Sequence, residues 1–174
     1  RFNHVKTSVI HDTFPKLMKL CWPDCPYKLD KTDWFVEFPN GSQIWFGGLD
    51  DKERTEKILG NEYASIFLNE CSQISYSSYL MIITRLAQKC AYKVGDKEKE
   101  LRLKFYLDEN PPHKGHWTYK LFIEKIDPES KKPIQYPDDY SYLLMNPSDN
   151  VENLPATYIK ILEGMPKRQR DRFW

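Results

Sequence analysis

The chain has 174 residues, of which 40% are hydrophobic and 29% are charged, and its formal net charge is +1. This length supports one domain with a hydrophobic core, and the composition is ordinary for a globular protein. The small net charge gives no overall electrostatic reason to expect nucleic-acid binding, and no apolar run is long enough to cross a bilayer. The chain begins at Arg1 with no initiator Met or signal peptide, so we expect a piece of a longer protein.

The first stretch with a clear period is residues 5–20, whose apolar side chains recur at helical spacing. Pro15 is expected to kink or divide this helix. Residues 21–31 contain two prolines and are predicted to form a loop. This loop includes Cys21 and Cys25, whose spacing loosely resembles that of metal ligands, but no second pair follows them. We therefore interpret the cysteines of the chain as reduced thiols.

A β-hairpin is predicted next. Residues 34–38 and 43–46 have the composition of strands, and the Pro-Asn-Gly-Ser sequence between them suits a tight turn. Residues 49–59 are highly charged, and two interpretations stay open for them: a short exposed helix or a mobile loop.

The most informative stretch is the apolar run of residues 64–68, which stops at Asn69 and Glu70. Such a run predicts a strand buried on both faces, as in a parallel sheet. Ligands of open α/β sheets bind at the carboxyl ends of the strands. In a nucleoside triphosphatase, an acidic residue at this position holds Mg²⁺ or orients the attacking water. The alternative is a strand that simply ends in a polar loop.

A second strand with a polar end follows. Residues 75–88 have helical spacing and are expected to pack on the sheet, whereas residues 93–100 are interpreted as a solvated run of charges. Residues 101–107 alternate as in a strand, which ends at Asp108-Glu109-Asn110, beside the end of the first. Strand, helix and strand in this order predict an α/β fold with a parallel sheet, to which the hairpin adds an antiparallel element.

The remaining elements are shorter. We expect a helix over residues 117–126, a strand over 140–144 and a turn over 146–150. A helix over residues 155–162 is favoured by Pro155 at its start and by a glycine just after its end. The last stretch, residues 167–172, is basic.

The order of these motifs resembles the large terminase subunit of tailed bacteriophages, the motor that packages DNA. The resemblance covers nearly the whole chain and depends on the order and spacing of the motifs together. The motifs that carry it are Ile44-Trp45-Phe46-Gly47-Gly48-Leu49-Asp50-Asp51, Ser65-Ile66-Phe67-Leu68-Asn69-Glu70, Ser78-Tyr79-Leu80, Thr84-Arg85-Leu86, Asn110-Pro111-Pro112, His116-Trp117-Thr118-Tyr119, Asp149-Asn150-Val151-Glu152-Asn153-Leu154-Pro155 and Tyr158-Ile159.

The resemblance implies a fold. The family has an N-terminal ATPase domain and a C-terminal nuclease domain, and this chain is similar to the later part of the ATPase domain. It implies an α/β fold with a mainly parallel sheet of the P-loop NTPase (ASCE) type, flanked by helices, with a β-hairpin and a small C-terminal lid or linker. Residues 1–135 would be a partial ATPase core, and residues 136–174 a lid or linker subdomain leading towards an absent nuclease domain.

The resemblance also implies a site. Residues 66–70 would be the Walker B strand, with Glu70 as the catalytic carboxylate. Asn69 and Asn110 would belong to the nucleotide and Mg²⁺ site, Asn110 as part of the coupling motif that senses the nucleotide. The implied cofactor is Mg²⁺ bound with ATP near Asn69 and Glu70, without a metal cage made by the protein alone.

Three departures from the family pattern matter. The chain has no G-x-x-x-x-G-K-[ST] motif, so the phosphate cradle is expected before Arg1. Asn69 replaces the usual Walker B Asp, and a neutral amide holds Mg²⁺ less well than a carboxylate. The Arg-Gly pair that many members carry before the Walker B Glu is Leu59-Gly60 here. Arg54 is the nearest candidate for an arginine finger, with a solvated side chain as the alternative.

Structural roles are considered for two further motifs. Arg85 either faces the nucleotide or caps a helix face, and His116-Trp117 is interpreted as core packing. His113 and His116 lack neighbours of known geometry that would make them metal ligands.

The resemblance implies a DNA-packaging ATPase whose isolated fragment is inactive. Its partners would be ATP, double-stranded DNA contacted through phosphates, the portal protein and the small terminase subunit, in a homo-oligomeric ring with no membrane contact. It would act in the host cytoplasm and transiently at the procapsid portal. Two alternatives stay open: another P-loop motor such as a helicase, although no Ser-Ala-Thr triplet follows the Walker B strand, and a non-catalytic phage-derived scaffold or binding module.

Overall fold

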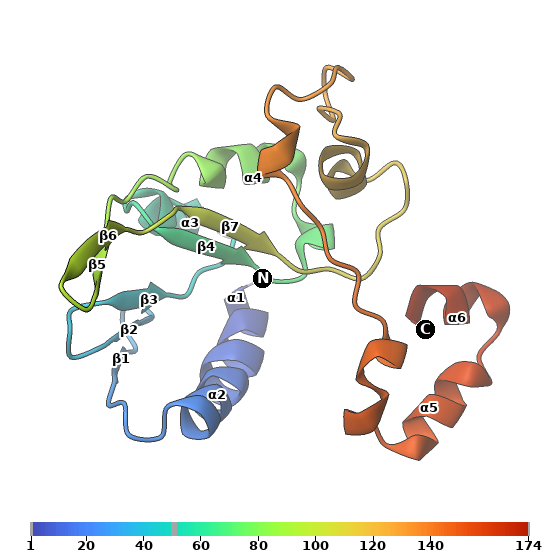
Figure 1. The fold of residues 1–174 in the computed structure, drawn as a ribbon, viewed down its shortest axis with the longest axis horizontal. Helices are drawn as coiled ribbons and strands as arrows, with labels where there is room; N and C mark the ends of the chain where they lie inside the picture. The colour runs from blue at the N-terminus through green and yellow to red at the C-terminus, as the bar shows by residue number, and fades with distance from the viewer. Residues whose placement is uncertain (1, 50–51, 174) are drawn as a thin grey trace. The chain divides into compact units, whose positions relative to one another are not determined.

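The structure is a computed structural model that describes residues 2–49 and 52–173, with the backbone alone for residues 52–54 and 171–173 (Figure 1). The chain forms two compact units. Unit 1 comprises residues 1–65 and 81–104, and unit 2 comprises residues 66–80 and 105–174.

Unit 1 begins with a continuous helical stretch. It consists of α1 (Phe2–His4), the π-helix η1 (Val5–Thr13) and α2 (Phe14–Cys21). This confirms the helix predicted for residues 5–20. Pro15 lies in the first turn of α2, and Thr13 and Phe14 before it both keep helical dihedral angles. The helix therefore changes from π to α near the proline without breaking.

An antiparallel sheet follows, with strand order β1 (Lys28–Asp30), β2 (Phe35–Glu37) and β3 (Gln43–Trp45). The predicted hairpin is confirmed: Phe35 pairs with Trp45, and Gly41 in the turn takes φ +80°, which suits glycine. β1 lies in the segment predicted as a loop. This three-residue strand has no apolar alternation of its own and is fixed by pairing with β2.

The core of unit 1 lies between α2 and this sheet. Phe14 and Met18 of α2 are buried with Val36 of β2, which is fully inaccessible to solvent. The ring of Phe14 packs edge-on against Tyr27 and Phe46, with centroids 5.1 and 5.8 Å away. Helix and sheet are thus held together by aromatic packing.

Two more elements complete unit 1. The helix α3 (Lys52–Leu59) agrees with the helical interpretation of the charged stretch. The segment predicted as a solvated run of charges forms a second hairpin, β5 (Ala91–Val94) with β6 (Lys97–Glu100). Its exposure was predicted correctly, but its strands were not.

Unit 2 is built around β4 (Ser65–Leu68) and β7 (Lys104–Leu107), whose first residues are assigned to unit 1. The Lys104 amide donates to the Ala64 carbonyl (3.3 Å) and the Asp108 amide to the Leu68 carbonyl (3.1 Å). Donor and acceptor advance together along the chain, so the two strands are parallel.

One face of this strand pair is packed and the other is open. Helix α4 (Tyr76–Ile83) is shorter than predicted, and its buried Tyr79 lies 5.3 Å from the ring of Phe105 in β7. On the opposite face Phe67 is 62% exposed and Tyr106 is 48% exposed. The prediction of a strand buried on both faces is therefore wrong for β4 in this chain.

A mainly parallel sheet is not confirmed for the described residues. They contain one parallel strand pairing, β4 with β7, and three antiparallel strand pairings between strands close in sequence, besides an isolated antiparallel bridge between Ile126 and Pro133. Antiparallel neighbours need only short turns, whereas each parallel pair needs a long crossover. The segment from residue 69 to 103 provides such a crossover once.

The rest of unit 2 consists of short helical elements: η2 (Cys71–Gln73), the π-helix η3 (Tyr119–Glu124), η4 (Pro137–Asp139), η5 (Pro147–Asn153), α5 (Ala156–Glu163) and α6 (Lys167–Phe173). The helix α5 agrees with the prediction, beginning after Pro155 and ending at Gly164. The strand predicted for residues 140–144 is wrong, because no described strand pairs with this segment. Across the described part of the chain, no helix has the length and apolar character to span a membrane.

Candidate functional site

The candidate site lies at the carboxyl ends of β4 and β7. Because the two strands are parallel neighbours, the residues that follow them emerge at the same edge. Asn69 and Glu70 follow β4, and the run from Asp108 to Asn110 follows β7. The structure therefore brings the two predicted polar strand ends to one edge of the strand pair.

Asp108 joins the two strand ends directly. Its Oδ1 accepts a hydrogen bond from the Glu70 amide (2.6 Å), and its backbone carbonyl accepts one from the Cys71 amide (2.9 Å). Glu70 has φ +54°, a left-handed conformation that is uncommon and costly for a residue other than glycine. These two hydrogen bonds, donated to Asp108 by the Glu70 and Cys71 amides, hold the backbone in that conformation and so fix the point from which the Glu70 side chain extends.

Sequence reasoning noted Asp108 as a polar strand end but gave it no role. Its position directly after an apolar strand was the only signal available. The hydrogen bond to Glu70 spans 38 residues of sequence, and no local pattern encodes it.

The predicted site residues are placed as follows. Glu70 is exposed, Asn69 is half-buried beside it, and Asn110 is exposed two residues after Asp108. That the side chains of Glu70 and Asn110 meet in one cleft stays a prediction. Arg54 lies in α3, but its side chain is outside the described residues.

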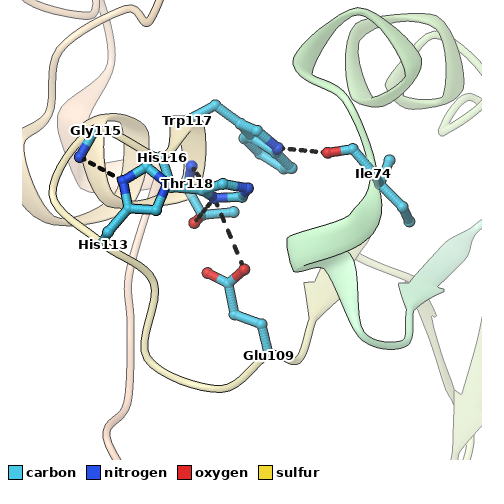
Figure 2. A network of polar contacts seen from close by, with 7 residues as sticks. All are labelled: Ile74, Glu109, His113, Gly115, His116, Trp117 and Thr118. Carbon is cyan, nitrogen blue, oxygen red and sulfur yellow. Dashed lines mark hydrogen bonds and ion pairs between the residues drawn. The ribbon is translucent and has the colours of Figure 1, made fainter. Parts of the chain in front are cut away.

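The loop after β7 is fixed at a second point (Figure 2). The Glu109 carboxylate points towards His116, with Oε2 3.9 Å from Nδ1, close enough for an ion pair when the ring is protonated. Both side chains are largely buried, and Glu109 Oε2 has no hydrogen-bond partner among the described residues. His116 Nδ1 also lies 2.7 Å from Thr118 Oγ1. Asn110 therefore lies in a loop anchored at Asp108 and near His116.

Aromatic packing by Trp117, two residues before η3, supports this loop. Trp117 is 7% exposed and stacks on Tyr79 of α4, with ring centroids 4.8 Å apart. Its indole Nε1 donates to the Ile74 carbonyl at 2.7 Å, as Figure 2 shows. For Trp117, this agrees with the interpretation as core packing, since the ring is buried and its one polar atom is satisfied.

The neighbouring Cys71 has an unreactive thiol. It is fully buried, and burial together with the nearby Glu109 and Asp108 carboxylates raises the pKa of its thiol. A thiol kept protonated is a poor nucleophile. All four cysteines are free, and the described residues contain no group of three or more His, Cys, Asp or Glu side chains that could hold a metal.

Arg85 makes structural contacts within unit 1. Its guanidinium donates from Nη1 to the Leu59 carbonyl (3.2 Å), and its backbone carbonyl accepts from the Tyr63 amide (2.7 Å). These bonds tie the segment just after α4 to the end of α3 and to the loop before β4, in keeping with the structural interpretation of this residue.

The chemistry available at the strand ends is that of carboxylate and amide oxygens. Glu70 offers an exposed carboxylate on a fixed backbone, which is what a group that polarises a water molecule requires. Carboxylate and amide oxygens are also the hard donors that Mg²⁺ prefers. The side chains at the strand ends are therefore of the donor types that a magnesium ion takes together with phosphate and water oxygens.

These features define an α/β protein with acidic groups at the ends of a parallel strand pair. The fold is similar to that of the solved large terminase from a thermophilic bacteriophage, with a TM-score of 0.68 and 16% sequence identity. That match covers 99% of this chain and 37% of the solved chain, so this chain spans well under half of its length. At this identity, the likeness shows the fold alone.

The sequence comparison gives the family. Residues 2–174 match the family model described as phage terminase large subunit, and the chain belongs to that family. No curated protein matches the chain. The resemblance inferred from the order of the motifs is confirmed.

Proposed function

We propose that this chain is the later part of the ATPase domain of a DNA-packaging motor, with Glu70 as its catalytic carboxylate. Family membership supports the motor. The observation that carries the catalytic assignment is the hydrogen bond from the Glu70 amide to Asp108, which joins the carboxyl ends of the two parallel strands.

In this proposal Glu70 accepts a proton from, or orients, the water that attacks the γ-phosphate of ATP. Asn69 and Asn110 would hold the nucleotide and its Mg²⁺, and a bound Mg²⁺ would supply positive charge next to the phosphates. Asp108 keeps the Glu70 backbone in its left-handed conformation. Arg54 is proposed as the arginine finger.

The phosphate cradle is proposed to lie outside these 174 residues, since they contain no Walker A motif. The remaining strands of a mainly parallel P-loop sheet are likewise proposed to lie outside these residues. The exposed Phe67 and Tyr106, on the open face of the strand pair, support this, because such side chains are buried in a complete parallel sheet. Residues 136–174 are proposed to be the lid or linker that leads to a nuclease domain.

The whole motor is proposed to act on double-stranded DNA as a homo-oligomeric ring, with the portal protein and the small terminase subunit as partners. Its place would be the host cytoplasm and, transiently, the procapsid portal.

The test uses the full-length protein with Glu70→Gln. We expect phosphate release to fall at least about 100-fold, because the amide cannot act as the base, while ATP binding changes little. Glu62→Gln is the matched control: Glu62 is an exposed glutamate before β4, and its replacement should leave turnover at the wild-type level. Wild-type turnover in Glu70→Gln would refute the catalytic assignment.

A non-catalytic scaffold is the second candidate, and Asn69 in place of the usual acidic residue favours it. A scaffold predicts no phosphate release by the full-length protein, with or without DNA. The proposed motor predicts turnover by the full-length protein and negligible turnover by this chain alone.

A further inference from the structure

The hairpin β5–β6 contributes nothing to a hydrophobic core, because all eight of its strand residues are exposed. Isolated two-stranded hairpins are marginally stable in water, so the turn and the hydrogen bonds of the hairpin must stabilise this one. Gly95 takes φ +61° as the first residue of the loop Gly95-Asp96, the position at which a type II′ turn favours glycine. At the base, the Leu101 amide donates to the Cys90 carbonyl (2.8 Å). Both faces of the hairpin are therefore open to a partner.

The two faces differ in charge. Residues directly opposite each other in an antiparallel pair lie on the same face. Tyr92 pairs with Lys99 and Val94 with Lys97, and these four residues form the lysine face. The opposite face, the glutamate face, consists of Ala91, Lys93, Glu98 and Glu100. The alternation of lysine and glutamate along β6 thus separates the charges in space.

The lysines of the lysine face are not neutralised by neighbours. Neither Lys97 nor Lys99 forms an ion pair with a described residue, whereas Glu100 on the other face lies 3.9 Å from Lys89. Residues 89–104 hold six Lys or Arg and three Asp or Glu, a net charge of +3, whereas the whole chain has +1. The near-neutral net charge of the whole chain therefore hides a local excess of positive charge in and around the hairpin.

We propose that the lysine face of the hairpin binds the phosphate backbone of double-stranded DNA. Lys97 and Lys99 supply the charge, and the exposed Tyr92, on the same face, supplies a hydroxyl that can donate to a phosphate oxygen. Contacts of this kind carry no base recognition, as a motor that moves along any sequence requires. The identity of the polyanion as DNA rests on the proposed function.

The test measures the affinity of the full-length protein for a short duplex of arbitrary sequence over a series of NaCl concentrations, without nucleotide. Each phosphate contact contributes about 0.9 to the slope of log K against log salt. In Lys97→Gln/Lys99→Gln we expect that slope to fall by about 1.8. An unchanged slope overturns the proposal. That result is expected if the hairpin binds an acidic protein surface and not DNA.

The chain offers a matched control on the same hairpin. Lys99→Gln and Lys93→Gln make the same change of charge on opposite faces. We expect the slope to fall by about 0.9 for Lys99→Gln and to stay at the wild-type value for Lys93→Gln. Equal losses in both variants would overturn the assignment to the lysine face. Far-ultraviolet circular dichroism checks that each variant remains folded. Because DNA binding is measured without ATP, this result is independent of the Glu70→Gln result.

Discussion

The parallel pair β4–β7 and the antiparallel hairpin β5–β6 use their side chains in opposite ways. In β4–β7 one face is packed against α4, and polar residues occur where the strands end. In β5–β6 no side chain is buried, and the polar residues occur along the strands themselves. Packing is needed where a few groups must be held in one geometry, and it is not needed where charges act at a distance.

The same contrast appears in the backbone. Glu70 is held in a left-handed conformation by hydrogen bonds that its own amide and the next one donate to Asp108, a residue far away in the sequence. Gly95 adopts a positive φ in a tight turn that its own sequence favours. The first position depends on the surrounding structure, and the second depends on local chemistry.

The largest expected effect compares an aromatic residue in each region. Trp117→Ala removes a buried ring that stacks on Tyr79 and donates to Ile74, so we expect the free energy of unfolding to fall by about 3–5 kcal/mol. Tyr92→Ala removes a half-exposed ring from the hairpin, and we expect a change within about 0.5 kcal/mol. Urea unfolding of the two variants measures both values. Similar losses in both would mean that the hairpin is packed after all.

A smaller effect is expected at the contact between the strand ends. Asp108→Ala removes the acceptor of the Glu70 amide, whereas Asp108→Asn keeps an oxygen in its place. In the full-length protein we expect Asp108→Ala to lower kcat about tenfold, or ~1.4 kcal/mol, with little change in the KM for ATP. Asp108→Asn should recover most of the rate. Steady-state phosphate release measures both variants, and wild-type kcat in Asp108→Ala would show that the contact does not position Glu70.

The sequence was sufficient where structure is local. Asn40-Gly41 between two apolar stretches predicted the first hairpin, and Pro155 and Gly164 marked the ends of α5. It failed for β5–β6 because alternating lysine and glutamate give no apolar period. The Gly95-Asp96 turn was the one signal of a hairpin there. Residues 140–144 have strand-like side chains, but a strand also needs a partner, and the described residues provide none.

The site was also predictable only in part, because only some of its features are local in the sequence. Two apolar runs that end in polar residues identified Glu70 and Asn110 as candidates, and the parallel pairing brings their strands together. The hydrogen bond from the Glu70 amide to Asp108 and the approach of Glu109 to His116 depend on the conformation of the loops that follow the strands. Contacts that depend on loop conformation in this way leave no recognisable pattern in a single amino-acid sequence.

The central claim is that nucleotide binds at the carboxyl ends of β4 and β7. The most direct test is a crystal structure of the full-length protein with Mg²⁺ and a non-hydrolysable ATP analogue. We expect the γ-phosphate at this edge, with the Glu70 carboxylate and the Asn110 amide both beside it and the hairpin β5–β6 free of nucleotide. An analogue bound elsewhere, or Glu70 and Asn110 on opposite sides of the strand pair, would contradict the assignment.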